Sequence, residues 1–196
     1  MQPLGVTDLD RVDREAVLLA AIDCVVRIGD HGLLATHVAA EAGTEIERVR
    51  GFFPTASALA EAVVDRITDE ILGTLNEALS PDDRLRLHLR SLARMGRERP
   101  ALFLVLAELE LRGCRDGLVR AALARSTRAW RDRLDALVRE GVTRGVFSAS
   151  LDVEAVVDLI TAAAAGTGPR SDPSSRRLAQ LERLLLPGTP GACTGS

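Results

Sequence analysis

Lysine and tyrosine are absent from this sequence, and all 25 basic residues are arginine. We attribute the exclusive use of arginine mainly to the codon bias of a GC-rich genome. Cysteine is scarce as well, since only Cys24, Cys114 and Cys193 are present. Their odd number and wide spacing argue against a disulfide framework and against a zinc-binding motif. Cys24 is therefore expected to fill space in the core.

Long apolar runs are also missing, since none approaches the roughly 18 residues that a membrane span needs. Residues 1–12 hold acids and a proline instead of the cationic start and apolar stretch of a secretory signal. The chain of 196 residues is 46% hydrophobic, with a mean hydropathy of +0.09, which is enough for one or two units with a substantial core. We therefore expect a globular cytoplasmic protein without a membrane partner.

Motifs of catalysis and phosphate binding are absent too. There is no glycine-rich phosphate loop, no Gly-x-Ser-x-Gly and no His-Glu-x-x-His. The three histidines are scattered: His31 and His37 are expected to be solvated or to cap a turn, and His88 to bond within a core or to contact a ligand. The sequence thus predicts no enzyme, no catalytic residue, no cofactor and no metal site.

Residues 14–59 show the periodicity of three helices in close succession. The first has an apolar face with helical spacing, formed by Val17, Ala20, Ala21, Cys24, Val25 and Ile28. Gly29 is suited to end it, and Gly43 is suited to a sharp turn between two further short helices. This arrangement predicts a helix-turn-helix, a module that usually reads DNA.

The same stretch resembles the amino-terminal pattern of the TetR family of bacterial transcriptional regulators. The matching positions are Val17, Leu18, Ala20, Ala21, Gly29, Val38, Ala39, Glu41, Ala42, Gly43, Phe53 and Leu59. The resemblance implies an all-α fold, with a three-helix DNA-binding domain at residues 8–58. Residues 59–187 would then form a helical bundle for ligand binding and dimerisation. Residues 188–196, rich in Gly, Pro, Thr and Ser, are expected to be a disordered tail.

Several positions on the expected DNA-facing surface depart from the family pattern. Arg50 stands where the family usually has tyrosine, and Ala56 where lysine is common. Glu47 replaces a small residue, and Leu33 and Leu34 replace hydroxyl residues at the start of the second helix. Residues 1–75 contain six arginines against thirteen acidic residues, a formal charge of −7, although DNA affinity depends on neutralising phosphates.

Beyond Leu59 the sequence predicts helices almost throughout. They are expected from a Thr55 cap to about Leu79, then at 80–97, 101–112, 118–144, 152–165 and 174–186. The buried stripe of the longest is expected at Val119, Leu123, Thr127, Trp130, Leu134, Leu137 and Val138. By resemblance, segments 118–144 and 152–166 would pair across a two-fold axis into a four-helix bundle, with Ala164 on the small-residue face that meets the partner. The alternative is a helical hairpin within one chain.

Two sets of candidate binding residues follow. An effector site, with apolar walls and few polar anchors, is expected at His88, Phe103, Leu106, Glu108 and Trp130, with a filled core as the alternative. One of the acids Glu108 and Glu110 is expected to face inward and to need an arginine partner, for which Arg94, Arg97 and Arg112 are the candidates.

The expected DNA contacts belong to the second and third helices. Thr44 and Arg50 would bind phosphate, Arg48 with Glu45 would face base edges, and Thr36 would hold the second helix against the DNA backbone.

Two functions remain open. The first is a ligand-responsive regulator, a repressor in most of the resembling family, that binds operator DNA as a homodimer with a small-molecule effector. The second is a TetR-like fold that has lost DNA binding and acts as a small-molecule binding protein or an enzyme.

Overall fold

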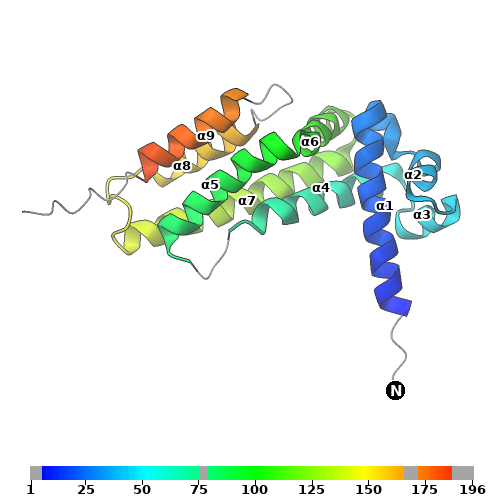
Figure 1. Cartoon of the computed structure of the whole chain (residues 1–196), viewed down its shortest axis with the longest axis horizontal. Helices are drawn as coiled ribbons and strands as arrows, with labels where there is room; N and C mark the ends of the chain where they lie inside the picture. Colours follow the sequence, from blue (N-terminus) through cyan, green and yellow to red (C-terminus); the bar gives the residue numbers. More distant parts are fainter. Residues whose placement is uncertain (1–5, 76–78, 166–171, 187–196) are drawn as a thin grey trace, which may run out of the picture. The chain divides into compact units, whose positions relative to one another are not determined.

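The computed structural model describes residues 6–75, 79–165 and 172–186, and within them every regular element is a helix (Figure 1). The elements are α1 (Val6–Ile28), the short 3-10 helix η1 (Gly29–Leu33), α2 (Ala35–Ala42), α3 (Ile46–Phe52), α4 (Ala56–Leu72), α5 (Pro81–Glu98), α6 (Pro100–Gly113), α7 (Gly117–Thr143), α8 (Val153–Ala165) and α9 (Asp172–Leu185). The predicted all-α fold is confirmed. The predicted tail at 188–196 lies outside the described residues.

The packing divides the chain into two compact units. Unit 1 comprises Met1–Glu70 with Ala101–Arg128, and unit 2 comprises Ile71–Pro100 with Ala129–Ser196. In unit 1, α6 and the first part of α7 therefore pack with the amino-terminal helices. This grouping differs from the division expected after residue 58, and the ion pair between Arg112 of α6 and Asp30 of η1 is one contact within unit 1.

The core of unit 1 begins with the predicted apolar face of α1. Val17, Ala21, Cys24 and Val25 are at most 2% exposed, and Cys24 fills the core as expected. The predicted face is wrong at its last member, since Ile28 is 49% exposed. The reason is that α1 ends there: Gly29 turns the chain with a φ of 66°, which favours glycine.

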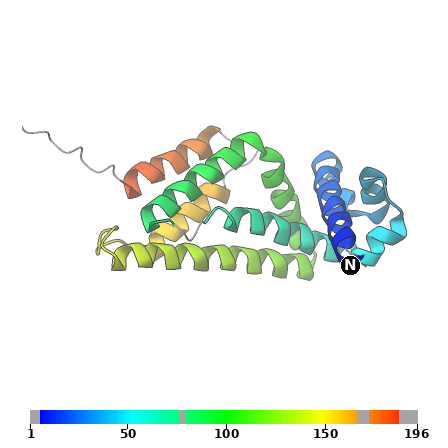
Figure 2. The ribbon, with the colours of Figure 1, turned by 60° about the horizontal axis from the view of Figure 1, so that its bottom comes forward.

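Unit 2 is built around one hydrophobic cluster. Its largest fully buried members are Leu85, Leu89, Leu92, Leu134, Leu137, Ile160 and Leu178. These residues come from α5, α7, α8 and α9, and Figure 2 shows α9 lying along α5. The helix α5 begins as predicted, with Ser80 as N-cap accepting a hydrogen bond from the Asp83 amide and Pro81 in the first turn.

Two sequence-based expectations about the long helices need correction. The helix that starts after Thr55 ends at Leu72 rather than near Leu79, because Gly73 interrupts it and the amide of Thr74 bonds back to the carbonyl of Ile71. In α7, Thr127 is exposed although the stripe placed it inside. Its neighbour Ser126 is half-buried instead and bonds to Thr68.

Candidate functional site

The amino-terminal helices form a compact pair joined by a tight turn. Gly43 ends α2 with a φ of 64°, and the amide of Thr44 donates to the carbonyl of Ala39 at 3.0 Å. Val49 of α3 is 1% exposed and packs in the core of unit 1. Val49 is the buried residue of this seven-residue helix, and its other side chains are exposed or half-buried. The helix-turn-helix expected from the sequence is thus present in unit 1.

All five predicted DNA-contact residues lie on α2, on α3 or in the turn between them. Thr36, Glu45, Arg48 and Arg50 are exposed, and Thr44 is half-buried. Within the described part of the chain, Arg50 has no ion-pair partner. Its guanidinium is therefore available for a phosphate oxygen, which is the role that the sequence predicts for it.

Arg48 is engaged within the protein. Its guanidinium pairs with the carboxylate of Asp13 on α1 and lies 5.3 Å from the ring centroid of Phe52. Both members of the ion pair are exposed, so water screens their attraction and the pair contributes little stability. Asp13 was not identified from the sequence, because the helical pattern was expected to begin at residue 14. In the structure α1 begins at Val6 and therefore includes Asp13.

His88 and Trp130, two of the five predicted effector residues, contact each other in unit 2. The indole N–H of Trp130 donates to Nε2 of His88 at 3.0 Å, and Nδ1 of His88 lies 2.6 Å from the hydroxyl of Thr74. Because Nε2 accepts, the ring proton is on Nδ1 and donates to Thr74, whose hydroxyl donates to the carbonyl of Ile71. Burial lowers the pKa of His88 to about 4, so the ring is neutral.

Phe103, Leu106 and Glu108, the other three predicted effector residues, lie on α6 in unit 1, and all are half-buried. The carboxylate of Glu108 lies close to Gly29. If residue 29 had a Cβ atom, that atom would be only 3.2 Å from Oε2 of Glu108. Glu110 is exposed, so Glu108 is the more buried of the two acids considered from the sequence. The effector site itself stays a prediction.

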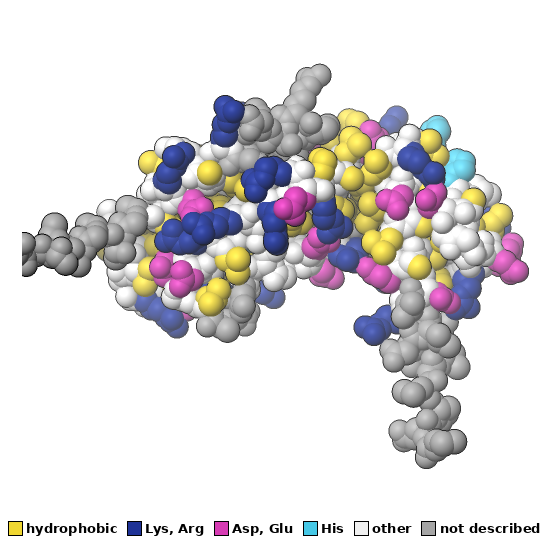
Figure 3. All heavy atoms as spheres, viewed as in Figure 1, with side chains coloured by type: hydrophobic (Ala, Val, Ile, Leu, Met, Phe, Trp, Pro, Cys, Tyr) yellow, Lys and Arg dark blue, Asp and Glu magenta, His cyan; other side chains and the backbone are white. Residues whose placement is uncertain are grey.

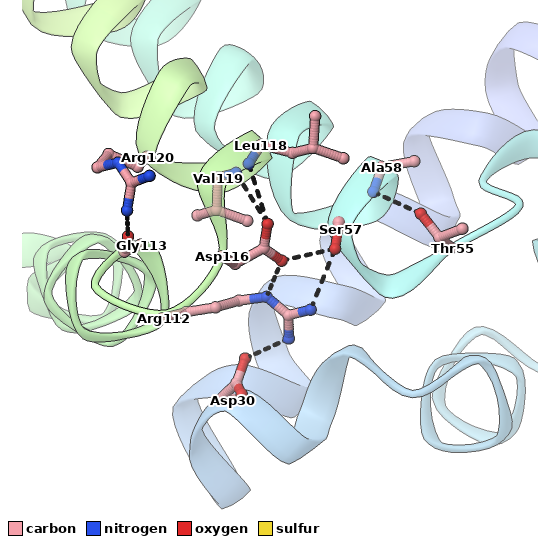
Figure 4. A network of polar contacts seen from close by, with 10 residues as sticks. All are labelled: Asp30, Thr55, Ser57, Ala58, Arg112, Gly113, Asp116, Leu118, Val119 and Arg120. Atoms are coloured by element: carbon pink, nitrogen blue, oxygen red, sulfur yellow. Dashed lines mark hydrogen bonds and ion pairs between the residues drawn. The ribbon is translucent and has the colours of Figure 1, made fainter.

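A polar network in unit 1 surrounds Arg112 at the end of α6 (Figure 4). Its guanidinium binds Asp30 of η1 at 2.6 Å and Asp116 at 3.2 Å. The hydroxyl of Ser57, in the first turn of α4, donates a hydrogen bond of 2.6 Å to the carboxylate of Asp116. Arg112, which the sequence offered as a partner for Glu108, therefore binds two other acids.

Contacts within this network shift the pKa values of Arg112 and Asp116. Burial would lower the pKa of Arg112, but the hydrogen bonds and charges of Asp30 and Asp116 outweigh it and the pKa is raised. The Ser57 hydroxyl, followed by the amides of Val119 and Leu118, lowers the pKa of Asp116. Arg112 and Asp116 therefore stay charged near neutral pH. The network connects η1, α4 and α6 with the beginning of α7.

An apolar groove of about 330 Å³ lies between α8 and α9 in unit 2. Leu159 is 55% exposed at its edge, and Ala162 and Leu181 contribute to its walls. Ala164 does not belong to this open surface, because it is 4% exposed within the single chain and packs into the core of unit 2. The expectation that Ala164 faces a partner is therefore wrong.

Among the residues that the structure describes, no helix is both long enough and apolar enough to cross a membrane. Nor do three or more His, Cys, Asp or Glu side chains of those residues gather as metal ligands would.

Comparisons with known proteins agree with the resemblance. Residues 103–179 match the family model of the tetracyclin repressor-like C-terminal domain. A Rhodococcus sp. protein assigned to the TetR-family transcriptional regulators is similar, with a TM-score of 0.74 and 24% identity over 88% of this chain and 98% of that one. Salmonella enterica GusR gives a TM-score of 0.73 and 21% identity over 88% and 92% of the two chains. No curated protein sequence matches.

AibR, solved in complex with isovaleryl coenzyme A and operator DNA, shares the fold at a TM-score of 0.68 and 15% identity, over 90% of this chain and all of that one. The match of residues 103–179 and the shared fold confirm the resemblance predicted from the sequence. The chain is a TetR-like protein, with the fold of the TetR-family regulators.

Proposed function

We propose that the chain is a ligand-responsive transcriptional regulator, acting as a repressor, that binds operator DNA as a homodimer. The observation that carries the proposal is the α2–α3 pair of unit 1, whose exposed side holds Thr36, Arg48 and Arg50. A helix-turn-helix places its second helix in the major groove, while surrounding side chains and amides fix it on phosphates. We assign base contacts to Arg48 with Glu45, and phosphate contacts to Thr44 and Arg50.

The proposed response to an effector uses α6. This helix carries Phe103, Leu106 and Glu108, and at its end Arg112 binds Asp30 next to the carboxyl end of α1. A ligand that shifts α6 would therefore displace η1 and α1, which pack against α2. AibR, which has the same fold, was crystallised with both isovaleryl coenzyme A and operator DNA, so this fold is compatible with the two kinds of ligand.

A gel shift with DNA from upstream of the protein's own gene tests the proposal. We expect the wild-type protein to shift this DNA and the variant Arg48→Ala/Arg50→Ala to lose the shift. The melting temperature should change little, because both arginines are exposed. The matched control is Arg128→Ala/Arg183→Ala, which removes the same charge from exposed positions outside α2 and α3. A shift that survives the first double substitution would refute the contact assignment.

The second candidate function is a small-molecule binding protein that no longer reads DNA. It is favoured by the formal charge of −7 in residues 1–75 and by the pairing of Arg48 with Asp13. An acidic surface repels phosphate, so the regulator is expected to bind weakly and to release DNA at modest salt. Absence of a shift with upstream DNA even at low salt would favour this second candidate.

A further inference from the structure

A hollow of about 390 Å³ lies between α5 and α9, within unit 2 and apart from the α8–α9 groove. This volume is in the range of small-molecule sites. Leu89 and Ala93 of α5, which are 1% and 7% exposed, contribute its apolar base, and Ala179 of α9 lies across from them. None of the lining residues belongs to the effector set expected from the sequence.

The rim of this hollow carries a surplus of positive charge. Arg90, Arg94 and Arg97 all line it, and among the described residues that line it Glu182 is the one acid. Figure 3 shows arginine side chains gathered over α5 and the adjoining part of α9. The surplus matters because a ligand of opposite charge would find several cations within one small concave surface.

The single acid is already neutralised. Arg90 binds both carboxylate oxygens of Glu182, with Nε at 3.0 and 3.2 Å and a terminal nitrogen at 2.7 Å from Oε1. Arg86 adds a weaker contact at 3.4 Å. In the part of the chain that the structure describes, Arg94 and Arg97 have no ion-pair partner, and both are exposed. Two unpaired guanidinium groups therefore stand beside an apolar base.

We propose that this hollow binds an anionic amphiphile, a molecule with a carboxylate or phosphate group attached to a short apolar body. The anion would bind to Arg94 and Arg97, since guanidinium groups form strong charge-assisted hydrogen bonds with planar carboxylates and with phosphates. The apolar body would cover Leu89, Ala93 and Ala179. Binding stands independently of the DNA-reading function, and only its regulatory consequence rests on the proposed function.

The test is calorimetric titration of the full-length protein with four probes. Octanoate and octyl phosphate carry both features, 1-octanol lacks the charge, and acetate lacks the apolar body. We expect octanoate or octyl phosphate to bind at least tenfold more tightly than 1-octanol and acetate. The better of the two anions identifies the headgroup, which distinguishes a free acid from a phosphate ester.

Variants locate the binding. Arg94→Gln/Arg97→Gln should weaken the better probe about tenfold or more, whereas the charge-matched Arg128→Gln/Arg183→Gln should leave it unchanged. Ala179→Phe, which fills the hollow from an exposed position, should also weaken it without adding or removing charge. Equal affinity in all variants, or 1-octanol binding as tightly as the anions, would overturn the proposal. A protein that passes these tests yet fails to shift DNA would overturn only the proposed regulator.

Discussion

At the scale of single residues, His88 shows how burial and two hydrogen bonds determine the state of a side chain. The imidazole is fully buried, and both of its nitrogens have partners in Thr74 and Trp130. The sequence could place His88 near an apolar face but could not name these partners, because they come from positions 14 residues before it and 42 residues after it. A ligand that used His88 would first have to displace one of them.

The neutral state of His88 predicts a pH dependence of stability. Its pKa is about 4 in the folded protein and near 6.5 when unfolded, so the unfolded chain gains a proton first as the pH falls. The free energy of unfolding should therefore fall between pH 6.5 and pH 4, by about 3 kcal/mol in total. Urea denaturation of the wild type and of His88→Asn measures this term. Parallel pH curves for the two proteins would contradict it.

The pair of Arg48 and Asp13 gives a second prediction at this scale. Asp13→Asn breaks the ion pair between Asp13 and Arg48 and lowers the negative charge near α3, so affinity for a random-sequence duplex should rise severalfold at low salt. Fluorescence anisotropy of a labelled duplex measures the change. Asp23→Asn is the control, because it makes the same charge change at an exposed position on α1. The two variants should differ, and equal affinities would show that Arg48 has no particular role.

At the scale of elements, the helix ends were the most predictable feature. Gly29, Gly43 and Ser80 lie at ends where the sequence placed them, since φ preferences and capping hydrogen bonds are local. The early start of α1 at Val6 was not predicted, because residues before Arg14 show no clear apolar face. The contact of Arg112 with Asp30 joins residues 82 positions apart, and no local pattern encodes it.

The start of α2 carries a further prediction. Leu33 is 1% exposed and belongs to the core, but Leu34, the N-cap, is 51% exposed and provides no side-chain hydrogen bond. Its φ and ψ of −68° and 133° suit a capping serine. Leu34→Ser should therefore raise the free energy of unfolding by about 0.5–1 kcal/mol. Thermal melting of Leu34→Ser is compared with that of Leu34→Ala, which also removes the leucine side chain but adds no hydroxyl. The difference between the two variants measures the contribution of the capping hydrogen bond. A serine variant no more stable than the alanine variant would count against it.

At the scale of the whole molecule, the fold could be predicted from the sequence much better than the binding surfaces. Helical periodicity and glycine positions specify elements and their buried faces, as Val17, Cys24 and Ile160 show. Surfaces depend on which exposed residues stay unpaired after packing, and this is a property of the assembled chain. Arg50, unpaired among the described residues, and Arg48, paired with Asp13, look alike in the sequence.

The dimer proposed for this molecule is best tested on the open face of α8. Leu159 borders the α8–α9 groove and is 55% exposed, so Leu159→Arg adds a charge without disturbing the core of the single chain. We expect it to convert dimers into monomers in sedimentation velocity, because a charge buried at an interface without a partner is costly. Leu111→Arg, at a similarly exposed leucine of α6 in unit 1, should leave the dimer intact. A dimeric Leu159→Arg protein would exclude this face.

A nuclease footprint on the DNA upstream of the protein's own gene tests whether the protein binds operator DNA as a dimer. Two reading heads related by a two-fold axis engage half-sites about 34 to 36 Å apart, one turn of the double helix. We expect the protein to protect an inverted repeat with that spacing at low salt. The protection should be lost when Arg48 and Arg50 are both replaced by alanine. An unprotected upstream region at low salt, or protection without two-fold symmetry, would contradict it.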